Sequence, residues 1–338
     1  MKPELELFDR REFFRVVTKS AAILGLAGSA RAGAAGQGTT NPFAYDISRF
    51  LKTDPKLISH EEVARWPVPR KEARRVAIGP DGQLYVCAGN YITRVSRDGR
   101  SGLQLALAGP ASCVAVAWDG TIFAGLRDHI EVFDSTGARK ARWDSPDPKT
   151  WFTGLAVAEK DVFAADAVKL AVLRYDRTGK ITGRIGQKDA NRNAPGLVVP
   201  SPFLDVVLHK DGLLRVNNMG RHQVEAYTID GDMEAAWGKP TAAIEGFCGC
   251  CNPIALAFLP DGRIVTCEKG IPRVKIYSAS GEFESVVAGA ESFPENALTC
   301  NDLNDCVHGG IDAAVDSDGR IYILDLVAGD VRVMKRKV

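Results

Sequence analysis

A short pattern recurs along this chain and restricts its fold more than any other feature. It consists of an apolar run, an Asp-Gly pair and a second run rich in β-forming residues. Clear copies place Asp-Gly at residues 81–82, 261–262 and 318–319. Glycine supplies the positive φ that a tight turn requires, so Asp-Gly between two alternating apolar runs predicts a β-hairpin. The chain is therefore expected to consist of hairpins.

Six copies of the pattern follow one another between residues 75 and 337. Each copy has an apolar strand, a turn, a second strand, a loop, a third strand and, in most copies, another glycine turn. Repetition of this kind predicts an all-β, six-bladed propeller with four-stranded antiparallel blades. The sixth copy ends after its third strand, so we expect an N-terminal strand near residues 56–66 to complete it and close the ring.

The repeats resemble NHL repeats, in which Asp-Gly is followed by a hydrophobic residue and Tyr-Val, and later by Arg-Val and Tyr. Residues 81–86 and 273–277 follow that pattern, and the resemblance extends over about residues 75–337. It implies a six-bladed propeller and leaves function open, because such propellers serve both as enzymes and as binding platforms. It also implies structural, blade-to-blade ion pairs between repeat arginines and acids, namely Arg94, Arg273, Arg332, Glu268 and Asp325.

The N-terminal segment resembles a twin-arginine (Tat) signal peptide. Arg10 and Arg11 precede Phe13 and Phe14, a mildly apolar stretch follows, and small residues lie around Ala30. We therefore divide the chain into a signal peptide (1–35), a leader (36–55) and the propeller (56–338). The resemblance implies a periplasmic or otherwise Tat-exported protein, in which disulfides or a preassembled metal centre are both permitted.

Composition and charge exclude several classes of partner. The 338 residues are 45% hydrophobic and carry a formal net charge of +1. The chain can bury a large core, and it has no basic footprint for nucleic acid or an anionic membrane. No apolar run reaches the roughly 18 residues of a membrane-spanning helix. The expected partners are therefore an unidentified protein or small molecule.

The loops of a four-stranded meander separate onto two faces of a propeller. We call the face with the Asp-Gly turns the turn face. The crossing face carries the loops between second and third strands and the crossings between blades. Long crossings near residues 187–200, 240–251 and 290–307 indicate that the crossing face is the working face.

All eight cysteines fall on or beside the crossing face. Cys87 and Cys113 lie near the junction of the first two blades, and we expect them to form a structural disulfide. The other six gather at the fifth and sixth blades: Cys248, Cys250, Cys251, Cys267, Cys300 and Cys306.

Two interpretations of the six-cysteine cluster remain open. In one, three disulfides staple the long loops of a cofactor-free binding scaffold. In the other, thiolates hold a metal centre, for example an iron–sulfur cluster bound by Cys248, Cys250 or Cys251, Cys267, and Cys300 or Cys306. A zinc or copper site that includes His308 is a variant of the second interpretation. The expected function is ligand, partner or metal binding on the crossing face, with electron transfer as its extension.

An enzymatic alternative also follows from the resemblance, because some related six-bladed propellers are metal-dependent lyases or hydrolases. Their ligands would be His129, His222 and His308, all expected on the crossing face. His209 falls near an Asp-Gly turn and is expected to be a surface residue.

Overall fold

The structure is a computed structural model that describes residues 47–294 and 310–338. The chain forms two compact units, Met1–Arg49 and Phe50–Val338. The second unit contains all of the described strands.

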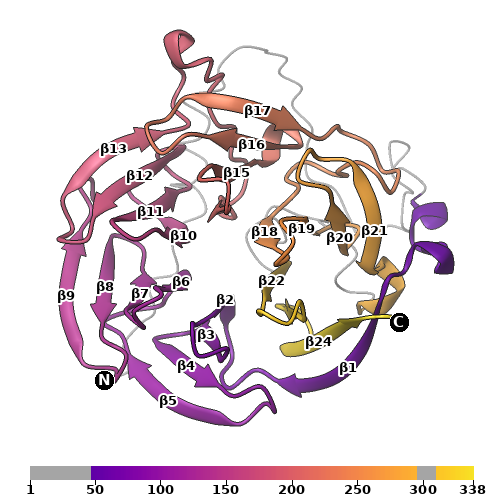
Figure 1. Ribbon diagram of the computed structural model, residues 1–338, viewed down its shortest axis with the longest axis horizontal. Helices are drawn as coiled ribbons and strands as arrows, with labels where there is room; N and C mark the ends of the chain where they lie inside the picture. Colours follow the sequence, from indigo (N-terminus) through magenta and orange to yellow (C-terminus); the bar gives the residue numbers. More distant parts are fainter. Residues whose placement is uncertain (1–46, 295–309) are drawn as a thin grey trace, which may run out of the picture. The chain divides into compact units, whose positions relative to one another are not determined.

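In the described residues, twenty-four strands form six four-stranded antiparallel sheets around a central channel (Figure 1). This arrangement confirms the expected six-bladed propeller. The first two blades are β2 (Ala73–Ile78), β3 (Leu84–Ala88), β4 (Tyr91–Val95) and β5 (Ser101–Ala106), then β6 (Cys113–Val116), β7 (Ile122–Gly125), β8 (His129–Phe133) and β9 (Arg139–Asp144). The third and fourth are β10 (Phe152–Val157), β11 (Asp161–Asp166), β12 (Ala171–Asp176) and β13 (Ile181–Ile185), then β14 (Val206–Leu208), β15 (Leu214–Asn218), β16 (Gln223–Tyr227) and β17 (Met233–Trp237).

The fifth blade is β18 (Ala255–Phe258), β19 (Ile264–Glu268), β20 (Arg273–Tyr277) and β21 (Phe283–Ala288). The sixth combines the two ends of the unit. It consists of β22 (Ile311–Val315), β23 (Ile321–Asp325), β24 (Asp330–Arg336) and the N-terminal strand β1 (His60–Pro67). Because β1 pairs antiparallel with β24, from His60 opposite Arg336 to Pro67 opposite Asp330, the expected N-terminal closure of the ring is confirmed.

The Asp-Gly turns have the predicted backbone. Gly82, Gly262 and Gly319 follow an aspartate and adopt φ values of 70°, 96° and 77°. In two of these turns, the aspartate side chain also accepts a hydrogen bond from the amide two residues on, as Asp81 and Asp261 do. The turn residues thus satisfy their own backbone groups, which places each first and second strand in register.

Aromatic side chains pack the blades against one another. Trp143 on β9 stacks on Tyr175 of the next blade with ring centroids 5.8 Å apart, and Trp237 on β17 lies 4.7 Å from Tyr277 on β20. Both tyrosines are fully buried. These contacts agree with the assignment of strand aromatics to blade packing.

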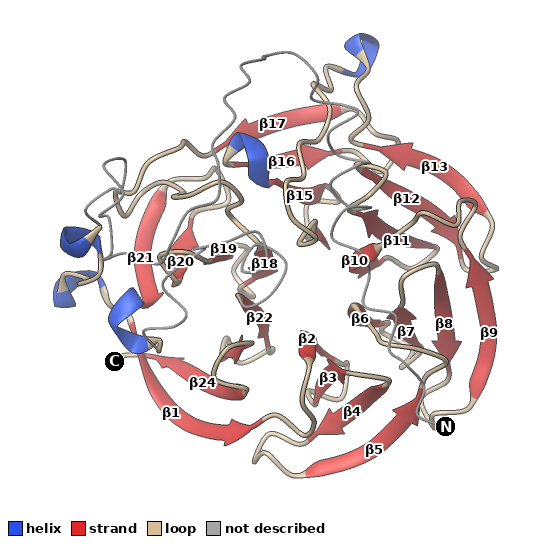
Figure 2. Cartoon of the chain, turned by 180° about the vertical axis from the view of Figure 1, so that it is seen from behind, coloured by secondary structure: helices blue, strands red, loops and turns tan. Residues whose placement is uncertain are grey.

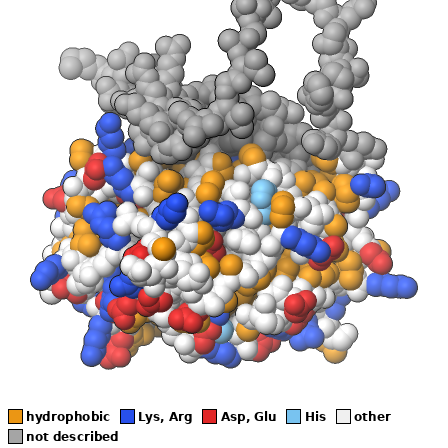
Figure 3. All heavy atoms as spheres, turned by 90° about the horizontal axis from the view of Figure 1, so that it is seen from above, with side chains coloured by type: hydrophobic (Ala, Val, Ile, Leu, Met, Phe, Trp, Pro, Cys, Tyr) orange, Lys and Arg blue, Asp and Glu red, His pale blue; other side chains and the backbone are white. Residues whose placement is uncertain are grey.

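Helical structure is confined to short 3-10 turns in the described residues: η1 (Ser48–Phe50), η2 (Pro55–Leu57), η3 (Ala190–Arg192), η4 (Met219–Arg221) and η5 (Ala290–Ser292). None of the described helices is long and apolar enough to span a bilayer. Figure 2 shows the same ring from behind, with these short turns in blue in the segments that connect the strands. Acidic and basic side chains intermingle on the edge of the ring visible in Figure 3.

Candidate functional site

The crossing before the fifth blade brings two cysteine thiols together. The Sγ atoms of Cys250 and Cys251 lie 3.6 Å apart, within hydrogen-bonding distance. Cys250 is exposed, whereas Cys251 is buried against the core. The loop therefore presents one thiol to solvent and holds its neighbour directly behind it.

A buried lysine anchors the first half of this loop. The Lys275 Nζ, on β20, donates hydrogen bonds to the carbonyls of Ile244 and Gly246 at 2.9 Å and 2.6 Å. It also lies 2.7 Å from Glu268 Oε1, and neither side chain is exposed. Burial lowers the pKa of Lys275 to about 8, and the attraction of Glu268 opposes that shift. Arg273 completes the anchor by binding Glu268 Oε2 at 2.8 Å.

An asparagine fastens the second half of the loop. The Asn252 Nδ2 donates to the carbonyls of Cys248 and Lys269, at 2.5 Å and 2.7 Å, and its Oδ1 accepts from the Lys269 amide at 2.9 Å. Outside the loop, His222 Nε2 lies 2.6 Å from the carbonyl of Gly249 and donates to it. Gly249 has a φ of 82°, which explains the glycine between Cys248 and Cys250. The thiols consequently sit on a fixed backbone.

The local environment raises the pKa of two thiols in this loop, those of Cys251 and Cys248. The hydrogen bond with Cys250 and then burial raise the pKa of Cys251 far above its ordinary value, against the smaller effect of the Lys269 ammonium. Burial likewise raises the pKa of Cys248, which the nearby Arg273 opposes. Any ligand that binds the thiolates must therefore displace protons.

The remaining described cysteines lie elsewhere, inside the propeller. Cys267, opposite Ala255 in the fifth blade, is fully buried, and burial raises its pKa well above the ordinary value. Cys87 and Cys113 are buried free thiols, so the disulfide expected between them is not formed in this structure. Burial raises the pKa of Cys87 to about 12.

The predicted four-thiolate set lies only partly within the described residues. Within residues 47–294 and 310–338, no three His, Cys, Asp or Glu side chains are placed to hold a metal ion. The amide of Cys248 lies 3.4 Å from the Glu268 carboxylate, and Cys267 is enclosed in the core. Cys300, Cys306 and His308, also predicted as ligands, lie outside the described residues.

The histidines have separate surroundings. The buried His129 places its Nδ1 2.6 Å from Asp128 and its Nε2 3.5 Å from Glu131. The ring of His222 instead contacts the cysteine loop, as described above. His209 is buried rather than exposed as expected, because its ring packs 4.5 Å from that of Phe258 and its Nδ1 lies 2.8 Å from Asp211.

The repeat arginines also differ from expectation. Arg273 binds Glu268, and Arg332 binds Asp325 at 2.7 Å, and each pair joins the second and third strands of one blade. The pairs are thus internal to a blade. Glu268 lies directly opposite Arg273, whereas Arg332 is two residues beyond Asp330, the residue opposite Asp325. Arg94 lies 3.9 Å from Asp81, again within one blade.

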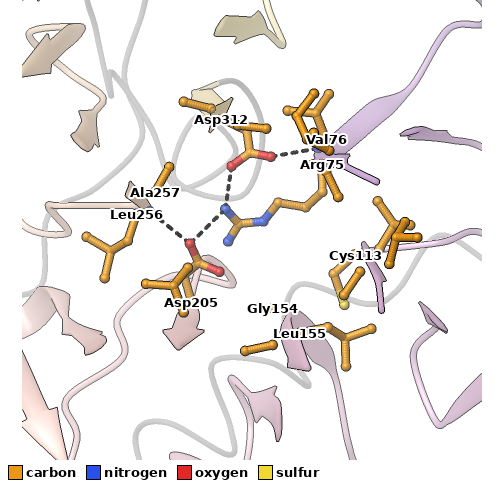
Figure 4. Close-up of a pocket in the computed structure, with 18 of the residues that line it drawn as sticks. Arg75, Val76, Cys113, Gly154, Leu155, Asp205, Leu256, Ala257 and Asp312 are labelled. Atoms are coloured by element: carbon orange, nitrogen blue, oxygen red, sulfur yellow. Dashed lines mark hydrogen bonds and ion pairs between the residues drawn. The ribbon is translucent and has the colours of Figure 1, made fainter. Parts of the chain in front are cut away.

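Sequence reasoning missed a charged cluster in the central channel (Figure 4). Arg75 Nη1 binds Asp312 Oδ1 at 2.8 Å and Asp205 Oδ2 at 3.4 Å. Burial lowers the pKa of Arg75, but the two carboxylates outweigh it and the net shift is upward. Burial raises the pKa of Asp205 to about 6, against the attraction of Arg75. The signal in the sequence is a charged residue near the start of three first strands, β2, β14 and β22.

The fold and this cluster define a six-bladed β-propeller with a charged channel. Among solved structures, the chain is similar to a streptogramin B lyase, with 12% identity, a TM-score of 0.57 and coverage of 82% of this chain and 97% of that one. It is also similar to virginiamycin B lyase from Staphylococcus aureus, with 13% identity, a TM-score of 0.56 and coverage of 83% and 100%.

A catalytically inactive variant of the Staphylococcus aureus enzyme with quinupristin has 13% identity and a TM-score of 0.54, and covers 83% of this chain and all of that one. At such identities the likeness establishes the propeller fold alone. No protein-family model and no curated protein match the sequence. The NHL assignment therefore stays a prediction.

Proposed function

We propose that this protein is an exported binding propeller that takes up a thiophilic metal ion on its crossing face through Cys250 and Cys251. The observation that carries the proposal is the 3.6 Å separation of the two Sγ atoms, with one thiol open to solvent. Soft thiolate ligands favour ions such as Zn²⁺ and Cu⁺.

The separation of the two sulfurs fits a shared ion. Zinc–sulfur bonds of about 2.3 Å at a tetrahedral angle place two thiolate sulfurs about 3.8 Å apart. Cys250 and Cys251 lie within a few tenths of an ångström of that spacing. Because Lys275 and Asn252 fix the loop on either side, little rearrangement is needed to present both sulfurs to one ion.

The residues present fit two positions of a metal site. A bound ion would replace the two thiol protons and give the loop a cross-link between its exposed and buried cysteines. Cys300, Cys306 and His308 are the candidates for the remaining positions, and an iron–sulfur cluster remains a variant of the same proposal.

Metal titration of the full chain tests this function. Reduced protein should bind Zn²⁺ or Cu⁺ in competition with a chromophoric chelator, at a stoichiometry of one ion per chain. Cys250→Ser and Cys251→Ser should each weaken binding by at least roughly tenfold, since each removes one of the thiolates. Cys87→Ser is the matched control, because that thiol is buried in another blade and should leave binding unchanged.

Equal affinity in the wild type and in both loop variants would contradict the proposal. Circular dichroism of each variant distinguishes a lost ligand from a lost fold. Absence of metal binding together with complete reactivity of Cys250 toward a thiol reagent would instead favour the cofactor-free scaffold.

The lyase or hydrolase alternative is less well supported by the described residues. The similar solved structures include lyases, but the likeness concerns the fold. His129 contacts Asp128 and Glu131, while His222 contacts Gly249, so these two histidines occupy different settings. The same titration with His129→Ala and His222→Ala separates the alternatives, because metal affinity that depends on histidine and not on Cys250 would favour the enzyme.

A further inference from the structure

The central channel contains a cavity that the cysteine site does not involve. Its volume is about 340 Å³, and the first strand of every blade contributes to its wall (Figure 4). That volume lies within the range of small-molecule sites, roughly 300–1,000 Å³. The two ends of the cavity differ in chemistry.

A charged floor closes the end nearer the crossing face. Of the described residues that line the cavity, three carry charge, namely Arg75, Asp205 and Asp312. Each of these side chains is less than a tenth exposed. Two carboxylates face one guanidinium, so the floor has an excess of one negative charge when both acids are ionised.

The guanidinium of the floor is already engaged. Arg75 Nε donates a hydrogen bond to the carbonyl of Thr153 at 3.1 Å, and its Nη1 donates to the carboxylates of Asp205 and Asp312. Each carboxylate can accept further hydrogen bonds, because it has about four lone-pair positions and accepts two hydrogen bonds from the groups named next. Asp312 binds Arg75 and the amide of Val76, while Asp205 binds Arg75 and the amide of Leu256. The floor can therefore accept a further N–H donor more readily than an anion.

An apolar collar surrounds the opposite end, at the turn face. Each blade contributes the residue that ends its first strand, and all six are half-buried: Ile78, Val116, Val157, Leu208, Phe258 and Val315. Ile78 lies three residues beyond Arg75 along β2, which corresponds to a depth of about 10 Å. The cavity thus combines an apolar entrance with an anionic base.

We propose that this cavity binds a small primary ammonium compound with an unbranched apolar tail. The ammonium group hydrogen-bonds Asp205 and Asp312 at the floor, and the tail lies against the collar. This inference rests on the channel alone, and it stands or falls independently of the metal site.

Calorimetric titration with n-hexylamine at neutral pH tests the proposal, with 1-hexanol and hexanoate as probes of equal length. We expect saturable 1:1 binding of the amine, with the alcohol at least roughly tenfold weaker and the carboxylate weaker still. Asp205→Asn should weaken amine binding by roughly tenfold or more, since it removes the charge and keeps an acceptor oxygen.

A second variant keeps the test independent of the ion cluster. Val157→Trp fills the collar from β10 and should abolish binding, whereas Trp118→Ala, at an exposed position of the turn face, should leave it unchanged. Hexanoate binding as tight as hexylamine would overturn the proposal. So would undiminished amine binding in folded Val157→Trp, or no saturable amine binding up to about 10 mM.

Discussion

At the scale of the residue, Arg75 connects four blades of the ring through its side-chain hydrogen bonds. From the first blade it reaches the Thr153 carbonyl of the third, Asp205 of the fourth and Asp312 of the sixth. These partners are all buried, so the guanidinium is balanced within the protein and not by solvent.

Replacement of Arg75 by methionine should therefore be costly. The change leaves two buried carboxylates without their counter-charge, and we expect a loss of about 3–5 kcal/mol in the free energy of unfolding. Chemical denaturation measures the effect. Arg100→Met, at an exposed arginine paired with Asp98, should change stability by less than about 0.5 kcal/mol. Equal effects of the two substitutions would refute the role assigned to Arg75.

The titration of Asp205 gives a second expectation at this scale. Burial raises its folded-state pKa to about 6 from 3.8, so the folded protein binds this proton more tightly than the unfolded chain. Stability contributed by this residue should consequently fall as pH rises from about 4 to about 6. The difference between wild type and Asp205→Asn, followed by denaturation across that window, should show this slope. A difference that does not vary with pH would count against it.

At the scale of the element, the repeat arginines and their neighbours hold the long crossings in place. Arg273 donates to the carbonyl of Ala242, and Arg332 donates to that of Ser292. In both blades an arginine of the third strand therefore binds the crossing that precedes the blade. Lys275 adds two further bonds to the cysteine loop.

Substitution of Lys275 by methionine should loosen the cysteine loop first. Glu268 and two carbonyls would lose a buried donor, so amide exchange over residues 240–251 should accelerate, and Cys250 should react faster with a thiol reagent. Hydrogen-exchange mass spectrometry resolves the loop. Lys239→Met provides the control, because that lysine is largely exposed and pairs with Glu245 at the surface. Unchanged loop protection in the Lys275 variant would be inconsistent with the anchoring described.

The local sequence pattern predicted the strands and turns, but it did not predict which residues from different blades meet across the ring. Asp-Gly turns and alternating strands have short-range causes, and Gly82 and Gly262 adopt the expected backbone. The channel cluster depends on Arg75, Asp205 and Asp312 meeting across the ring, which no local spacing reveals. The adjacency of Cys250 and Cys251 was visible in the sequence. The direction taken by Cys267, toward the core, depends on strand register.

At the scale of the whole propeller unit, closure depends on strand β1. It pairs with β24 over its full length, and His60 at its start is almost fully buried. Burial, followed by the charges of Arg336, Arg263 and Lys337, lowers the pKa of His60 to about 4. The folded ring therefore holds this imidazole neutral.

Acid should weaken the closure through His60. Because its folded pKa lies below the ordinary 6.5, the unfolded chain binds the proton more readily, and stability falls as pH drops from about 6.5 to about 4. His60→Asn should remove that part of the pH dependence while keeping an acceptor for Ser59. Thermal unfolding at a series of pH values measures both proteins. Parallel curves for the two would show that His60 does not contribute.

The pairing of β1 with β24 also has a consequence for synthesis. Strand β1, the first of the described strands to leave the ribosome, finds its partner only when β24 has been made, since His60 pairs with Arg336. Until then the sixth blade lacks its outer strand, and the contact of highest sequence separation forms late. A circularly permuted gene that begins at β2 and ends with β1 would make every blade from contiguous sequence.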